Sequence, residues 1–232
     1  MTQAKAWKHA ILLAIILCVF VSQSLAPDRG VLWPMVHDAL VTVAVLSVFL
    51  VVFEWRTDRI VAVAAAVIAI VCNWARYALP SGGGTAIGVA HDFALALFFS
   101  FAVVEILRGI FRQRAIRADD VLGSVCGYLL AGAAWASLHS LVDYLAPASF
   151  TLNESVGAQL DGWHTRHAVF DYFSLVTLST MGYGDVTPIR APALTLSWME
   201  AVFGQFYIAI VVAQLVAARL AQSLRSGNHD SR

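Results

Sequence analysis

The chain has 232 residues, of which 59% are hydrophobic and 13% are charged. Its basic and acidic residues balance to a formal net charge of zero, so the composition indicates no nucleic-acid partner. The mean hydropathy of +0.74 lies far above that of a soluble domain and predicts long membrane-embedded segments. The three cysteines fall in separate apolar stretches, which indicates neither a disulfide framework nor a metal site.

The first apolar segment, residues 9–26, follows Lys5 and Lys8 and has two interpretations. It is either a secretory signal peptide cleaved after Ala26 or a first transmembrane helix that stays in the protein. Pro27 stands directly after the cleavage position and disfavours cleavage, and the apolar stretch is long. We therefore expect an uncleaved helix.

Six segments are long and apolar enough to cross a bilayer, which takes about 20 residues each. They are residues 9–26, 36–54, 60–79, 90–110, 120–143 and 192–219. A seventh apolar stretch, His167 to Thr180, is too short to cross, and we expect it to be a re-entrant helix buried in protein. The predicted fold class is an all-α membrane protein with six transmembrane helices, a re-entrant helix and a following loop.

Lysine and arginine are distributed unequally between the two sides of this layout, which predicts its orientation. With the N-terminus inside, the outer side holds four arginines, at positions 29, 76, 166 and 190. The inner side holds Lys5, Lys8, Arg56, Arg59, Arg108, Arg112, Arg114, Arg117, Arg219, Arg225 and Arg232. We expect a multi-pass protein of the cell (inner) membrane with both termini in the cytoplasm.

Two His-Asp pairs, His37-Asp38 and His91-Asp92, begin the second and fourth predicted segments in the same way. They fit a faint repeat of two hairpins, an outer proton or metal site, or acids placed at helix N-termini, where the helix dipole favours negative charge. We favour the last interpretation. No further histidine or carboxylate is expected to converge on them, which disfavours a membrane enzyme or a metal-binding protein.

Residues 177–185 read Thr-Leu-Ser-Thr-Met-Gly-Tyr-Gly-Asp and form the most informative motif of the chain. Gly182 and Gly184 tolerate left-handed backbone conformations, which a row of carbonyls facing one axis requires. A glycine-rich surface turn is the plain alternative, but it leaves the placement of Thr180 and Asp185 unexplained. The motif resembles the selectivity filter of potassium channels, in which backbone carbonyls replace the hydration shell of K⁺.

The resemblance covers about residues 120–220 and implies a role for each matching position. The K⁺ ligands would be carbonyls of Thr180, Met181, Gly182, Tyr183 and Gly184, with the Thr180 hydroxyl as a further ring. Tyr172 and Phe173 would brace the filter, Asp185 would bond behind it at the outer mouth, and Glu200 would hydrogen-bond to the re-entrant helix. K⁺ ions in the filter are the only bound species expected, and no other cofactor is implied.

The last apolar segment would supply the inner helix of the pore. Gly204 stands at the spacing of the family's hinge glycine, although a small residue also serves close helix packing. Gln205, Ile208, Val212 and Val216 share one helical face and would line the cavity, with Ile208 or Val212 at a constriction. Glu200 is an acid deep within this segment, where an ionisable group is by default functional; a purely structural hydrogen bond is the alternative.

Two departures from the family pattern concern the filter. Met181 replaces the usual Val, and Val176 stands where some members carry an acid that pairs with the filter Asp. Because of both departures, a weakly selective cation channel is an alternative interpretation to a potassium-selective channel. A potassium-transporter subunit is a further alternative, but those proteins carry four filter-like loops in one longer chain, and this chain has one.

The remaining predictions concern organisation. Because one filter cannot enclose an ion, four identical chains are expected to form a homotetramer in contact with membrane lipids. We divide the chain into a four-helix region (1–117), a pore domain (118–222) and a short cytoplasmic tail (223–232). His91 to Leu107 contains no lysine or arginine, so strong voltage sensing is not expected. The prediction is passive K⁺ conduction, without enzymatic chemistry.

Overall fold

The computed structural model describes residues 7–24, 32–52, 59–79, 84–112, 118–153 and 163–227. Several residues named above lie outside these ranges. They are the proposed cleavage position at Ala26 and Pro27, and the charged residues Lys5, Arg29, Arg56, Arg114, Arg117 and Arg232.

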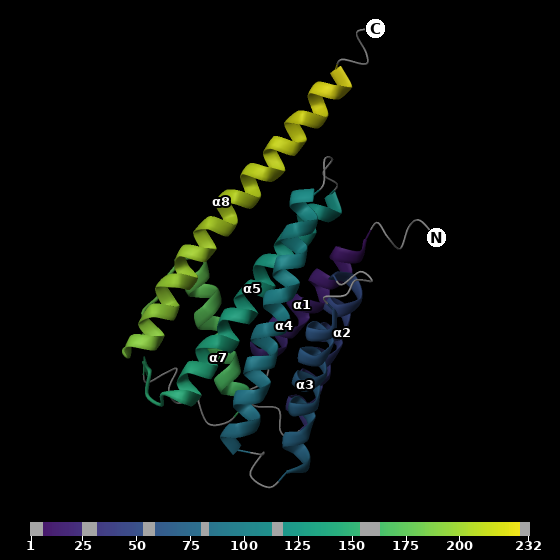
Figure 1. Cartoon of the computed structure of the whole chain (residues 1–232). Coiled ribbons are helices and arrows are strands. Elements are labelled where there is room, and N and C mark those ends of the chain that lie inside the picture. The colour runs from purple at the N-terminus through teal and green to yellow at the C-terminus, as the bar shows by residue number, and fades with distance from the viewer. Residues whose placement is uncertain are drawn as a thin grey trace.

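The described chain is built from long apolar helices, a shorter helix and two short strands (Figure 1). In order they are α1 (Lys8–Ser24), α2 (Leu32–Val52), α3 (Arg59–Ala78), α4 (Gly84–Arg112), α5 (Ala118–Leu145), β1 (Phe150–Leu152), α7 (Trp163–Leu178), β2 (Val186–Pro188) and α8 (Ala191–Gly227). In the described ranges α2, α3, α4, α5 and α8 are long and apolar enough to cross a membrane, which confirms the all-α membrane class.

Helix α1 matches the first predicted span but is short for a crossing. Its 17 residues reach about 25 Å at 1.5 Å per residue, against a hydrocarbon thickness of about 30 Å. The count of six crossings therefore stays a prediction. Helix α8 continues to Gly227, beyond the boundary expected at residue 222.

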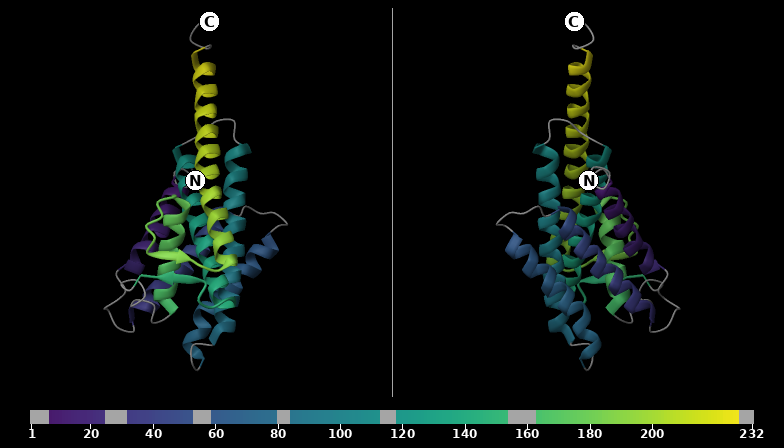
Figure 2. Two further views of the ribbon diagram at one scale, coloured as in Figure 1. Left: turned by 90° about the vertical axis from the view of Figure 1, so that its left-hand side faces the viewer. Right: turned by 90° about the vertical axis from the view of Figure 1, so that its right-hand side faces the viewer.

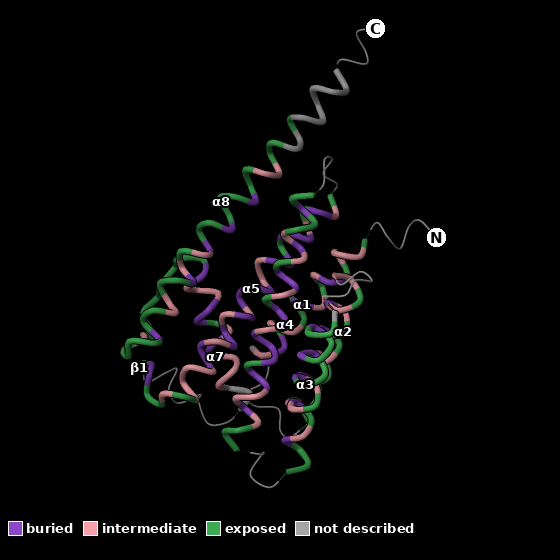
Figure 3. Tube along the Cα trace, viewed as in Figure 1, coloured by how far each residue is buried: buried purple, intermediate pink, exposed green. Residues whose placement is uncertain are grey.

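The helices form a bundle from which α8 diverges (Figures 1 and 2). Helix α4 packs between α3 and α5, α1 packs on α2 and α5, and α7 packs against α5 and α8. The main hydrophobic core centres on α4 and α5, where Phe98, Cys126 and Leu130 are buried, and it extends to side chains of the other helices. Burial falls off along α8, most of whose visible length carries exposed or half-buried side chains (Figure 3).

One short strand lies before α7 and a second follows the loop after α7, and the sequence did not predict them. β1 and β2 pair antiparallel, with Thr151 opposite Thr187. The amide of Ile189 also donates to the carbonyl of Ser149 at 2.8 Å. The chain leaving the filter motif is thereby fixed to the chain that leaves α5.

The helix boundaries overturn the favoured interpretation of the His-Asp pairs. Helix α2 begins at Leu32, with Pro34 in its first turn where proline is tolerated, and α4 begins at Gly84. Both pairs therefore lie beyond the first turn and are buried, where a helix N-terminus no longer stabilises an acid. The expectation of acids at helix N-termini was wrong.

Arg76 was counted among the arginines of the outer side, and the structure shows that its side chain is buried. It lies in the last turn of α3, where it is buried and forms an ion pair with Asp38, which Tyr77 also contacts through its hydroxyl. A buried charge pair of this kind fixes α3 against α2.

Candidate functional site

The end of α7 leads directly into the filter motif. Below, residues Thr180–Gly184 are called the filter segment. The amide of Thr180 donates to the Thr177 carbonyl and that of Met181 to the Val176 carbonyl, both at 2.9 Å. These bonds close the last turn of α7, whose carbonyl end carries the negative pole of the helix dipole. A cation beyond this end is electrostatically favoured.

The filter segment has an alternating backbone. Thr180, Gly182 and Gly184 have φ values of 58°, 55° and 78°, whereas Met181 and Tyr183 are not in the left-handed region. Alternation of the two backbone hands turns successive carbonyls toward the same side of the chain. Glycine adopts a positive φ without cost, but a β-branched residue such as Thr180 rarely does. The segment therefore has the backbone form that a file of carbonyls requires.

Side chains hold both ends of the filter segment. At its start, the Gln205 side chain of α8 donates to the Thr180 hydroxyl at 3.3 Å. Beyond its end, the Tyr172 hydroxyl donates to the Asp185 carboxylate at 2.5 Å, and the Tyr172 and Tyr183 rings stack with centroids 6.5 Å apart. The Asp185 carbonyl accepts a bond from the Asn153 amide at 2.9 Å. Asp185 thus links α7, the filter segment and the chain after β1.

Phe173, the second residue predicted to brace the filter, packs among side chains of its own chain. It is buried in a small second core with Phe150, Val169 and Phe170. Its ring meets the His139 ring edge-on, with centroids 4.9 Å apart. Phe173 therefore packs α7 against α5 and β1 of its own chain.

Glu200 of α8 is fully buried and connects three helices. Its carboxylate lies 2.7 Å from His139 Nε2 of α5 and accepts a bond from the Ser174 hydroxyl of α7 at 2.5 Å. The Ser174 hydroxyl also lies 2.6 Å from the Gly132 carbonyl of α5. The sequence predicted a hydrogen bond between Glu200 and the re-entrant helix, and the bond from Ser174 of α7 is such a bond. Sequence reasoning missed His139, although a histidine within an apolar span is the same signal that identified Glu200.

Replacing Glu200 with Ala is expected to destabilise the protein because the buried His139 ring loses its hydrogen-bond partner. Leaving a buried polar group unsatisfied costs about 1–3 kcal/mol. Thermal unfolding of the detergent-solubilised protein measures this loss. Met199→Ala is the matched control, since the Met199 side chain is 44% exposed on the same helix. Equal melting temperatures for the two variants would contradict the role assigned to Glu200.

Gly204 marks the closest approach of α8 to α7. A Cβ at this position would overlap the backbone carbonyl of Leu178 and lie 2.9 Å from the Leu178 carbonyl carbon. Helix α8 runs through Gly204 without interruption. The geometry thus supports the packing interpretation of this glycine, and Leu178 stands two residues before the filter segment.

One face of α8 is apolar and exposed in the single chain. Gln205, Ile208, Val212 and Val216 all lie on it, while Gly204, Tyr207 and Val211 face the bundle. The Tyr207 hydroxyl donates to the Ser124 carbonyl at 2.8 Å, which fixes the rotation of α8 against α5. The four residues predicted to line the cavity are therefore presented together, away from the bundle.

A second group of chemically active side chains lies away from the filter segment. His91, Asp92 and His167 place one ligand atom each within 4.8 Å of one another, a grouping that could hold a metal ion. The expectation that no histidine or carboxylate converges on the His-Asp pairs was wrong. Residues 91 and 167 are far apart in the sequence, and only the packing of α7 onto the bundle brings them together.

Comparison with known families agrees with this geometry. Residues 127–219 match the family model described as "Ion channel". The match covers less than half of the chain and takes in most of α5, all of α7, the filter segment and most of α8. No curated protein matches the chain. An ion-channel pore in a helical membrane protein is therefore supported.

Proposed function

We propose that this protein is a potassium-selective channel that conducts K⁺ passively. The observation that carries the proposal is the alternating backbone of the filter segment, with left-handed φ at Thr180, Gly182 and Gly184. Carbonyls of Thr180 to Gly184 replace water around a K⁺ ion, and no covalent chemistry is involved. Asp185 and Tyr172 stabilise this backbone from behind through their hydrogen bond.

The conducting unit is a homotetramer with one filter segment from each chain. One chain provides a single row of carbonyls, and closed cyclic symmetry lets four copies surround the ion. The exposure of Met181 (57%) and Tyr183 (65%) supports assembly, because these side chains extend from the filter segment without cover. Neighbouring chains would cover them, and the stripe of α8 containing Ile208 and Val212 would face the central cavity.

The proposed setting is the cell membrane, with the N-terminal end of α1 and the C-terminal end of α8 toward the cytoplasm. These two helix ends lie on the same side of the bundle, opposite the β1–β2 pair (Figure 1). The side of the membrane that carries β1, β2 and Asp185 would be the outer one. Arg108 and Arg112 lie at the cytoplasmic end of α4, where Arg108 pairs with Glu105. This placement makes them interfacial anchors.

Reversal potentials in planar bilayers test the proposal. With purified protein between unequal K⁺ and Na⁺ solutions, we expect the current to reverse close to the potassium equilibrium potential. A reversal midway between the two equilibrium potentials would instead support a weakly selective cation channel, the alternative that Met181 raises. Chemical cross-linking of the same sample should give four chains per particle. Absence of any K⁺ flux from cross-linked tetramers would contradict the proposal.

A further inference from the structure

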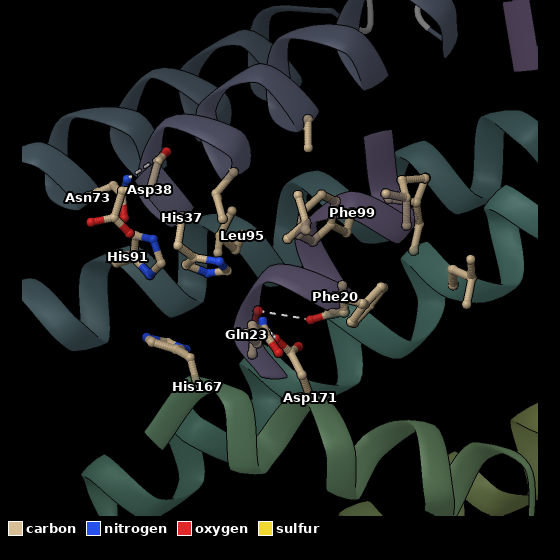
Figure 4. A pocket seen from close by; sticks show the side chains of 18 residues that line it. Phe20, Gln23, His37, Asp38, Asn73, His91, Leu95, Phe99, His167 and Asp171 are labelled. Carbon is tan, nitrogen blue, oxygen red and sulfur yellow. Dashed lines mark hydrogen bonds between the residues drawn. The ribbon is translucent and has the colours of Figure 1, made fainter. Parts of the chain in front are cut away.

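The group formed by His91, Asp92 and His167 joins two parts of the protein that are far apart in sequence. His91 and Asp92 lie on α4, and His167 lies near the start of α7. Asp92 Oδ1 is 3.1 Å from His91 Nδ1 and 3.5 Å from His167 Nε2. The two imidazole rings meet edge-on with centroids 5.4 Å apart. Figure 4 shows His91 and His167 approaching one cavity from opposite sides.

Among the described residues, the ion pairs of Asp92 are with histidine, and the neighbouring arginines pair with other carboxylates. Nearby Asp38 pairs with Arg76, and Asp143 pairs with Arg166. Asp92 is fully buried, and its ion-pair partners in the described part of the chain are the two histidines. Its Oδ2 atom is buried with no hydrogen-bond partner among the described residues. A buried carboxylate in this state is costly unless a cation compensates it.

The two separations from Asp92 Oδ1 suit a divalent transition metal, and all three ligand atoms lie within 4.8 Å of one another. A tetrahedral zinc ion with ligands about 2.1 Å away holds them about 3.4 Å apart. The distances of 3.1 and 3.5 Å from Asp92 Oδ1 bracket this value. Two imidazoles and one carboxylate form a ligand set typical of zinc. The adjoining cavity of about 80 Å³ has room for water as the fourth ligand.

We propose that His91, Asp92 and His167 bind one divalent transition metal ion of the zinc class. The ion takes His91 Nδ1, His167 Nε2 and a carboxylate oxygen of Asp92, and it replaces the proton between His91 and Asp92. Because the ligands come from α4 and α7, the bound ion ties the helix that carries the filter segment to the N-terminal bundle. The inference that the bound ion controls conduction rests on the proposed channel function. The inference that the ion binds here does not depend on that function.

Metal titration of the purified full-length chain tests the site directly. Zn²⁺ is titrated by calorimetry, and Co²⁺ serves as a spectroscopic probe, since tetrahedral coordination gives it strong visible absorption. We expect one ion per chain and an at least tenfold weaker affinity for Asp92→Asn and His167→Ala. His37→Ala is the control, because His37 lines the same cavity and bonds to Ser22 at 2.7 Å outside the ligand group.

The titration distinguishes a metal site from a His-Asp ion pair. No stoichiometric binding by the wild type, or equal affinity in all four proteins, would overturn the proposal in favour of the ion pair. To exclude misfolding, each variant must elute at the wild-type size, and Zn²⁺ must raise the melting temperature of the wild type and His37→Ala by more than that of Asp92→Asn. If Zn²⁺ binds but leaves the bilayer current unchanged, the metal site is supported and only its control of conduction is refuted.

Discussion

Replacing Gly182 with Ala is expected to abolish the proposed potassium-selective current while leaving the proposed tetramer assembled. Gly182 has a φ of 55°, and an alanine in the left-handed region costs roughly 1–2 kcal/mol. Apart from the adjacent residues, no described residue places an atom within 4 Å of the added Cβ, so backbone strain and not a clash drives the change. Rotation of the backbone out of the left-handed region would turn a carbonyl away from the ion in every chain of the proposed tetramer.

Two other glycines provide matched controls for this variant. Gly84 at the start of α4 has a φ of 66° and open space around an added Cβ, so Gly84→Ala introduces the same strain far from the filter segment. Gly109 in the same helix is also open and has no positive φ, so Gly109→Ala introduces neither strain nor clash. Bilayer recordings with Gly182→Ala that reverse at the potassium potential, like those of the two controls, would contradict the filter assignment.

Replacing Gly204 with Ala is expected to destabilise the protein and to disturb the proposed conduction together. The new Cβ would overlap the Leu178 carbonyl, and a backbone atom has no alternative rotamer through which to move away. Helix α8 or the end of α7 must shift, and overpacking of this kind costs about 1–3 kcal/mol. Thermal unfolding and single-channel conductance, measured on the same preparation, test both expectations.

The packing and hinge interpretations of Gly204 differ in this experiment. A hinge glycine that serves bending alone predicts altered open probability with unchanged stability and conductance. Gly132→Ala is the control for added volume, because its Cβ would lie 2.7 Å from the end of the flexible Leu175 side chain, which can rotate. An unchanged melting temperature for Gly204→Ala, relative to wild type, would contradict the packing role.

The parts of the fold that the sequence predicted are those encoded locally. A run of about 20 apolar residues is a property of one segment, and the long helices appear where such runs occur. The filter motif is likewise contiguous, and its glycines indicate the positive φ values found at Gly182 and Gly184. The predicted first residues of the helices were less accurate. For α2, Pro34 is a sequence signal that could have located its first turn.

The interactions that the sequence did not predict join residues distant along the chain. His139, Ser174 and Glu200 meet because α5, α7 and α8 pack together, and apolar periodicity does not specify which polar atoms face one another. The grouping of Asp92 with His167 has the same origin. The β1–β2 pair was missed because strands of three residues carry too little pattern to be recognised.

The uncovered side chains of the filter segment have a consequence for biosynthesis. A lone subunit exposes the Tyr183 phenol and the Met181 thioether at the point where, in the proposed tetramer, its neighbours belong. In the proposed tetramer, a newly inserted subunit would cover these side chains only after association with further copies of this chain. At low expression, the number of working pores should rise more steeply than the amount of polypeptide made.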